Sequence, residues 1–139
     1  MSVKTMNKII KLNQLLKNIK PKLSVESYIF CTIKYSDKVG LKNLDPLCTF
    51  KEDEGLTLIL EKSSALKNGF KSEQVFKKIT LQVYSNLADI GLTSVISTCL
   101  SDDGISANIV AGFYHDHIFV PSDKADKAFN ILNSLSEKS

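Results

Sequence analysis

The sequence predicts an α+β fold made of two ferredoxin-like βαββα units in tandem, with a mainly antiparallel sheet and helices on one face. Three observations support this prediction. Residues 79–135 follow the order strand, helix, strand, strand, helix, and residues 28–69 repeat that order more weakly. An amphipathic helix precedes both segments. We therefore expect an N-terminal helix over residues 1–22, a first, degraded unit over 23–76 and a second unit over 77–139.

The N-terminal helix is predicted by apolar residues that recur with helical spacing. Lysines lie mostly on the opposite side of this helix, and Pro21 ends the segment. A basic amphipathic helix can bind an acidic membrane surface, but a helix packed on the domain with a solvated lysine face is the simpler interpretation. We therefore expect no membrane partner. The apolar positions are Met6, Ile9, Ile10, Leu12, Leu15, Leu16 and Ile19.

The first unit is predicted from short segments of contrasting composition. Aromatic and β-branched residues indicate strands, while polar and charged stretches between them indicate turns. The periodicity is weaker here than in the rest of the chain, and for this reason we describe the unit as degraded. The expected elements are a strand at 28–33, a loop or weak helix at 34–45, strands at 47–50 and 56–60, and a short helix from Ser63, its cap, to Gly69.

The second unit is predicted from the clearest periodicity in the chain. Ile79, Leu81 and Val83 alternate with polar residues, which is the two-residue period of a half-buried strand. A helical face follows and ends at Gly104, and Ser122 is expected to cap the last helix. The helical faces are Leu92, Val95, Ile96, Cys99 and Leu100, then Ala125, Ala128, Phe129, Leu132 and Leu135, with strands at 105–111 and 117–120 between them.

Composition argues against several classes of protein. No apolar run approaches the roughly 20 residues that span a bilayer, and no signal-peptide profile is present, so we expect a cytoplasmic protein. The three cysteines, Cys31, Cys48 and Cys99, are widely spaced within apolar patterns, which favours free thiols. All 18 basic residues are lysine. Because arginine is the usual residue for bidentate recognition of bases and phosphates, we expect no nucleic-acid partner.

The turn before the first helix of the second unit is the leading candidate site. A helix N-terminus presents free backbone N–H groups and a partial positive charge, which suit a ligand carboxylate. Gly91 allows close approach, Asp89 can pair with an ammonium group, and Asn108 can add an amide. The alternative is that Asp89 only caps the helix and Gly91 only turns the chain. The candidate ligand-binding residues are Ser85, Asn86, Asp89, Ile90, Gly91, Leu92, Thr93, Asn108 and Ile109.

A weaker alternative places a metal at His115 and His117. In a regular strand these side chains share a face and can ligate zinc, but the sequence contains no third histidine to complete the site. A hairpin with Asp116 orienting the turn is the simpler interpretation. The acidic run over residues 52–54 is expected to be a solvated turn, and no paired nucleophile and base occur. We therefore expect no cofactor and no enzymatic activity.

Two segments carry a resemblance to a known family. They are DPLCTFKEDEGLTLIL, from Asp45, and GLTSVISTCLSDDGISANIVAGFYHDHIFVP, from Gly91, in which GLT and YHDHIFVP are the specific parts. They resemble small bacterial proteins built from ACT domains and, more distantly, the ACT modules of cytosolic arginine sensors. The resemblance covers most of the chain beyond Tyr28. It implies a regulatory domain that binds a small molecule, commonly an amino acid, at an interface between ACT units.

The oligomeric state is predicted from the strand over residues 117–120. Both faces of this strand are apolar, so both sides require cover, and the predicted helices supply only one. The other cover comes from the first unit or from a second chain. ACT units commonly associate, so the resemblance implies a homodimer. A purely structural oligomerisation domain remains the alternative to a ligand-binding module.

Overall fold

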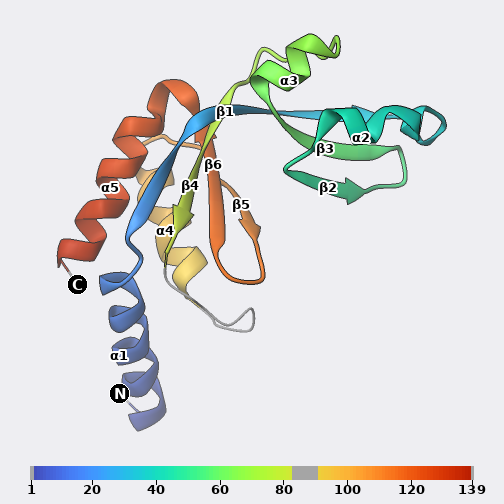
Figure 1. Ribbon diagram of the computed structural model, residues 1–139. Helices are drawn as coiled ribbons and strands as arrows, with labels where there is room; N and C mark the ends of the chain where they lie inside the picture. Colours follow the sequence, from blue (N-terminus) through green and yellow to red (C-terminus); the bar gives the residue numbers. More distant parts are fainter. Residues whose placement is uncertain (1, 83–90, 139) are drawn as a thin grey trace. The chain divides into compact units, whose positions relative to one another are not determined.

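The computed structural model describes residues 2–82 and 91–138 (Figure 1). Helices and strands alternate along the chain in the predicted order, with the helices of the first unit the shorter ones. The elements are α1 Val3–Lys17, β1 Pro21–Ile33, the 3-10 helix η1 Tyr35–Gly40, α2 Leu41–Leu44, β2 Cys48–Lys51, β3 Leu56–Glu61, α3 Lys62–Lys67, β4 Phe76–Leu81, α4 Leu92–Asp102, β5 Asn108–Ala111, β6 Asp116–Pro121, the 3-10 helix η2 Ser122–Lys124 and α5 Ala125–Lys138.

The described strands form a six-stranded sheet in the order β2-β3-β1-β4-β6-β5. β3 pairs antiparallel with both β1 and β2, and β5 pairs antiparallel with β6. Strands far apart in sequence are therefore hydrogen-bonded neighbours, and β4 and β5 belong to the same sheet. These observations confirm the predicted α+β, ferredoxin-like class with a mainly antiparallel sheet.

Contacts divide the chain into two compact units. The terminal unit combines Met1–Ser24 with Lys78–Ser139, and the central unit is Val25–Lys77. β1 and β4 each cross this division, so each supplies residues to both units. In the terminal unit, the amide of Lys78 donates to Ser24 Oγ over 3.0 Å, and the amide of Gln82 donates to the carbonyl of Ile19 over 2.7 Å. The beginning of β1 thus serves as a strand partner for β4.

The core of the terminal unit lies between its strands and α1, α4 and α5. Alternate residues of β4 and β6 point into it, as strand periodicity requires. The N-terminal helix is part of this core, and Ser136 Oγ of α5 donates to the carbonyl of Lys17 over 2.9 Å. The buried residues are Leu16, Ile19, Ile79, Leu81, Leu92, Ile96, Leu100, Ile105, Ile118, Val120, Ala125, Ala128 and Leu132.

The core of the central unit is smaller. It contains Ile29 of β1, the alternating leucines of β3, Leu44 of α2 and Ala65 of α3. The helices are linked by Ser64 Oγ, which donates to the carbonyl of Leu44 over 3.1 Å. α2 and α3 have only four and six residues, so the α-helices of this unit are shorter than those of the terminal unit.

Several local predictions were wrong. The first strand, β1, begins at Pro21 and not at residue 28. Ser63 and Ser122 lie inside helical segments. The N-caps of these segments are Glu61 and Pro121, and neither makes a side-chain capping hydrogen bond. β5 begins at Asn108 and not at residue 105. Ile105 is 1% exposed and its amide donates to the carbonyl of Leu100 over 3.0 Å, so its apolar character reflects core packing at the end of α4. The predicted stop at Gly104 is confirmed by its φ of +72°.

The described helices include none that is both long and apolar enough to cross a membrane.

We predict that Leu132→Ala lowers the free energy of unfolding by about 2–5 kcal/mol, because truncation of a fully buried leucine loses apolar burial and leaves a cavity. Leu66→Ala in α3 is the matched control, since Leu66 is 57% exposed and should cost far less. Urea unfolding followed by circular dichroism measures both. Equal losses in the two variants would contradict this description of the core.

Candidate functional site

The start of α4 is the part of the predicted site that the structure describes. Gly91 is its N-cap with φ +108° and ψ −33°, a backbone conformation that strongly favours glycine. The first helical bond runs from the amide of Val95 to the carbonyl of Gly91 over 3.0 Å, so the N–H groups of Leu92, Thr93 and Ser94 precede the helical ladder. The N-cap has no side-chain hydrogen bond, and no acidic residue lies in the first turn.

The N-terminal end of α4 carries a partial positive charge, and no acidic side chain in its first turn offsets that charge. α4 is 11 residues long, so its peptide dipoles add over three turns. Thr93 is exposed there, whereas Leu92 is only 4% exposed and points into the core. Leu92 can therefore contribute its backbone to a ligand but not its side chain. This end of the helix suits an anionic group, such as a carboxylate.

Leu12 of α1 is a neighbour of this helix end that sequence reasoning missed. A Cβ atom built on Gly91 would lie 3.6 Å from Leu12 Cδ2. Leu12 belongs to the apolar stripe predicted for the N-terminal helix, so the sequence signals its burial but not its partner. The N-terminal helix thus borders the candidate site.

The remaining predicted ligand-binding residues divide into two groups. Ser85, Asn86, Asp89 and Ile90 lie outside the described residues. Asn108 and Ile109 lie on β5, which is an edge strand of the sheet. Asn108 is exposed, and its side-chain Nδ2 lies 3.5 Å from the carbonyl oxygen of Phe119, to which it donates. Ile109 is half-buried and packs against the core of the terminal unit.

The register of the sheet places Asn108 away from the β5–β6 hairpin. Ala111 pairs with Asp116 beside the hairpin, and Val110 pairs with His117, which shares a hydrogen bond with Thr80 of β4. Asn108 lies two residues beyond Val110, roughly 7 Å along the strand. The structure therefore does not bring Asn108 to the hairpin end of the sheet.

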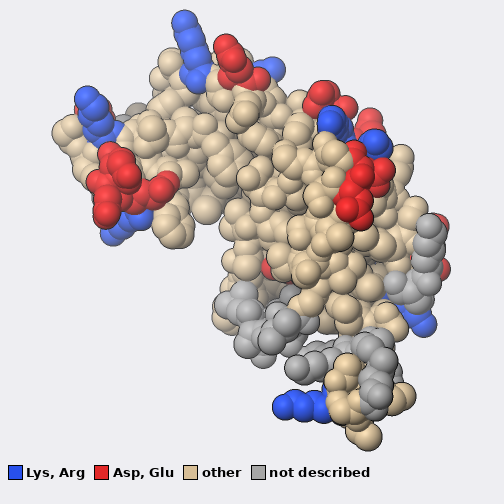
Figure 2. Space-filling view, turned by 180° about the vertical axis from the view of Figure 1, so that it is seen from behind, with Lys and Arg blue, Asp and Glu red and all other residues tan. Residues whose placement is uncertain are grey.

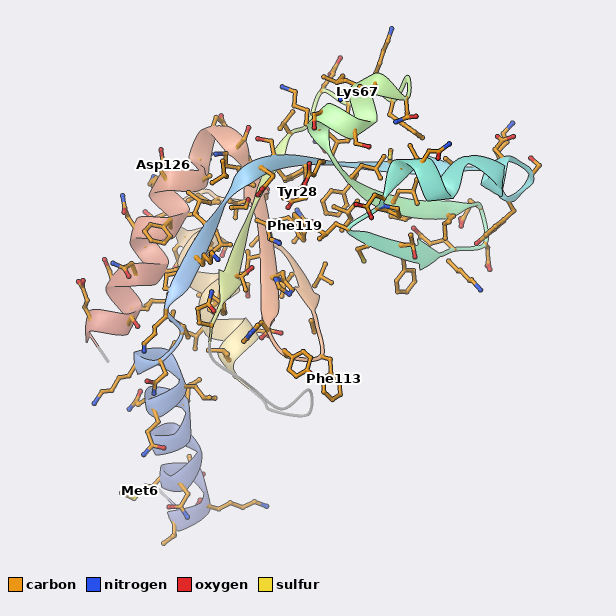
Figure 3. All side chains as sticks on the ribbon, in the orientation of Figure 1. Met6, Tyr28, Lys67, Phe113, Phe119 and Asp126 are labelled. Atoms are coloured by element: carbon orange, nitrogen blue, oxygen red, sulfur yellow. The ribbon has the colours of Figure 1, made fainter. Side chains whose placement is uncertain are left out.

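The histidine motif forms this hairpin. The amide of Gly112 donates to the carbonyl of His115 over 2.9 Å and closes the turn. Phe113 and Tyr114 stand at its tip, 68% and 66% exposed, with ring centroids 5.1 Å apart in a T-shaped arrangement (Figure 3). The expected hairpin is therefore present.

The two histidines have different surroundings and do not lie together on one strand. His115 lies in the turn, and its buried Nδ1 has no hydrogen-bond partner among the described residues. His117 lies in β6, and its Nδ1 is 2.9 Å from Thr80 Oγ1. Within residues 2–82 and 91–138, no group of three His, Cys, Asp or Glu side chains gathers to hold a metal ion. A zinc site centred on this motif would lack its further ligands in this part of the chain.

Burial lowers the pKa of His117 below its ordinary value of 6.5. Lys78 and His115 lower it further by charge repulsion, while Asp116 acts in the opposite direction. The ring is also closely packed, since a Cβ atom at Gly112 would lie 3.2 Å from His117 Nε2 and 2.8 Å from the carbonyl oxygen of His115. Only glycine fits at position 112 without a shift of the backbone, which is a constraint the sequence did not reveal.

The described residues offer no activated nucleophile. Burial raises the pKa of the Cys31 thiol, which disfavours the reactive thiolate. In the acidic run, Glu52 accepts a hydrogen bond from Thr57, and the Tyr35 hydroxyl donates to the carbonyl of Glu52. These contacts give Glu52 a structural role in the β2–β3 hairpin.

Comparison with known proteins identifies matches to one domain family. The model of the ACT domain matches residues 9–77, and a second ACT-domain model matches residues 72–134. A Vibrio cholerae protein of unknown function, described as a possible transport protein, is 43% identical with a TM-score of 0.83, over 93% of this chain and 98% of that one. No curated protein matches the sequence.

Two further solved structures share the fold at low identity. The Agrobacterium tumefaciens protein Atu0741 is 17% identical with a TM-score of 0.64, over 84% of this chain and 87% of that one. The ligand-free regulatory subunit of aspartate kinase from Thermus thermophilus is 10% identical with a TM-score of 0.63, over 85% of this chain and 97% of that one.

The lowered pKa of His117 predicts a pH dependence of stability. In the unfolded chain His117 takes up a proton at about pH 6.5, whereas in the folded chain it does so only at lower pH. The contribution of neutral His117 to the free energy of unfolding is therefore fully present above pH 6.5 and is lost as the pH falls through the folded pKa. His117→Asn, which cannot titrate, should reduce the loss of unfolding free energy on acidification. An NMR titration of the histidine ring protons reads the pKa directly, and a His117 pKa above 6.5 would contradict the expected effect of burial.

Proposed function

Because this chain belongs to the ACT-domain family and carries two such domains in tandem, we propose that it is a non-catalytic regulatory module that binds an amino acid at an interface between ACT units. The similarity in fold to a regulatory subunit of aspartate kinase supports a regulatory role. In this proposal the ligand is not transformed. It shifts the packing of the units, or the affinity for a partner protein, by no more than its differential affinity for the two states.

The observation that supports this site is the start of α4. In this proposal the N–H groups of Gly91, Leu92 and Thr93 bind the ligand carboxylate. Those of Leu92 and Thr93 precede the first helical hydrogen bond, and Gly91 has no side chain to prevent close approach. Two further roles are proposed from the sequence. Asp89 binds the ammonium group of the ligand, and Asn108 adds its side-chain amide to the site. Ser85, Asn86, Ile90 and Ile109 complete the lining.

The proposed assembly is a cytoplasmic homodimer. The two apolar faces of β6 do not support it, because Ile118, Phe119 and Val120 are each at most 1% exposed within a single chain. Their burial therefore requires no second copy. Support comes instead from β5, which is an edge strand among the described strands, and from the exposed Phe113 and Tyr114 in the hairpin that follows it.

Amino-acid binding is tested by isothermal titration calorimetry with the ligand that gives the largest thermal shift in a panel of amino acids. Asp89→Ala should weaken binding strongly, because a ligand ammonium group then loses its charged partner. Asp102→Ala, at the opposite end of α4, is the matched control and should bind like the parent. Equal affinities for the parent and the Asp89→Ala variant would move the site elsewhere.

Dimerisation is tested by light scattering coupled to size-exclusion chromatography at high micromolar concentration. We expect twice the mass of one chain. Replacement of Phe113 and Tyr114 by serine should shift the equilibrium towards the monomer if the hairpin lies at the interface, without a large loss of stability because both rings are exposed. A parent protein that elutes as a monomer would refute the homodimer.

A further inference from the structure

The central unit contains a cavity that the proposed function does not use. Its volume is about 690 Å³, and it lies at the end of the unit where β1 leads into η1 and where the β2–β3 hairpin turns. Its apolar lining comes from Ile33 of β1, Leu44 of α2 and Phe70, which follows α3. All of these residues belong to Val25–Lys77, so this cavity is formed within one unit.

The short helices of the central unit explain why the cavity exists. Ile33 pairs with Leu56 in the last pair of the β1–β3 ladder, and Leu56 is buried. In the terminal unit, helices of 11 and 14 residues cover the sheet, whereas here α2 and α3 have four and six. α2 and α3 are about 6 and 9 Å long, and they do not span the β1 residues of the central unit, 25–33, which extend roughly 30 Å. The apolar floor near Ile33 is therefore left accessible.

Charged groups of both signs surround this floor. Lys34 and Asp37 come from the turn that opens η1, where the amide of Asp37 donates to the carbonyl of Lys34 over 2.9 Å. Glu54 comes from the β2–β3 turn, and Asn68 from the end of α3. All three charged side chains are exposed to solvent. Figure 2 shows acidic side chains gathered at one end of the central unit, with lysine nearby.

We infer that this cavity is a second ligand site, separate from α4, for a small molecule with one carboxylate and two amino groups, as in a basic amino acid. The Lys34 ammonium pairs with the ligand carboxylate, and Asp37 and Glu54 pair with its two ammonium groups. Ile33, Leu44 and Phe70 contact the aliphatic chain between them. The two lining carboxylates and one lining lysine favour a cationic ligand over a neutral or acidic one.

L-Ornithine is the probe, and L-norvaline, the same skeleton without the second amino group, is its matched control. Calorimetry on the full-length protein should show that norvaline binds about 3- to 10-fold more weakly than ornithine, since one charge pair is lost. Asp37→Asn and Glu54→Gln should each weaken ornithine binding by a similar factor. Asp53→Asn and Glu73→Gln, the same substitutions at exposed positions outside the lining, should leave it unchanged.

Three results would overturn the inference. They are an absence of ornithine binding, equal binding of ornithine and norvaline, and ornithine binding that Asp37→Asn and Glu54→Gln leave intact. If Asp89→Ala alone weakens ornithine binding, the ligand occupies the α4 site, so that the second site is refuted and the proposed function stands. Because Asp37 and Glu54 are exposed, folding of both variants is expected, and thermal melts verify it.

Discussion

The two units share two strands, β1 and β4, on which both depend. β1 and β4 each begin in one compact unit and end in the other, and β1 pairs with β3 in the central unit and neighbours β4 in the sheet. The amides of Lys78 and Gln82 are satisfied by groups at Ser24 and Ile19, more than 50 residues away in sequence. The N-terminal residues therefore belong with the C-terminal helices in one core.

The two candidate sites differ in how far helices cover the sheet beside them. In the terminal unit, long helices cover the sheet, and α1 reaches the start of α4 through Leu12. The N–H groups of the first turn of α4, which precede the helical hydrogen bonds, are then the candidate feature of this unit, and they suit an anion. In the central unit, short helices leave an apolar floor open between charged side chains. One fold thus provides two kinds of candidate site, which differ because their helices differ in length.

Much of the fold could be predicted because its causes are local. The period of β4, the apolar face of α4 and the stop at Gly104 each depend on a few adjacent residues, and the structure has them. The mistakes occurred where tertiary packing sets the pattern. Ile105 is apolar because it is buried in the core at the end of α4. Ser63 and Ser122 are of a residue type that commonly caps helices, but neither occupies the N-cap position. The contact of Leu12 with Gly91 and the cavity beside Lys34 depend on segments distant in sequence, so no local pattern could reveal them.

Binding of an amino acid at the N-terminal end of α4 is the central proposal. The most direct test is a titration of ¹⁵N-labelled protein, followed by amide chemical shifts, with the amino acid that stabilises the protein most in a thermal-shift panel. We predict that the largest changes occur at the amides of Gly91, Leu92 and Thr93, because these N–H groups would bind the ligand carboxylate. Saturable changes confined to other residues, with these three amides unmoved, would contradict it.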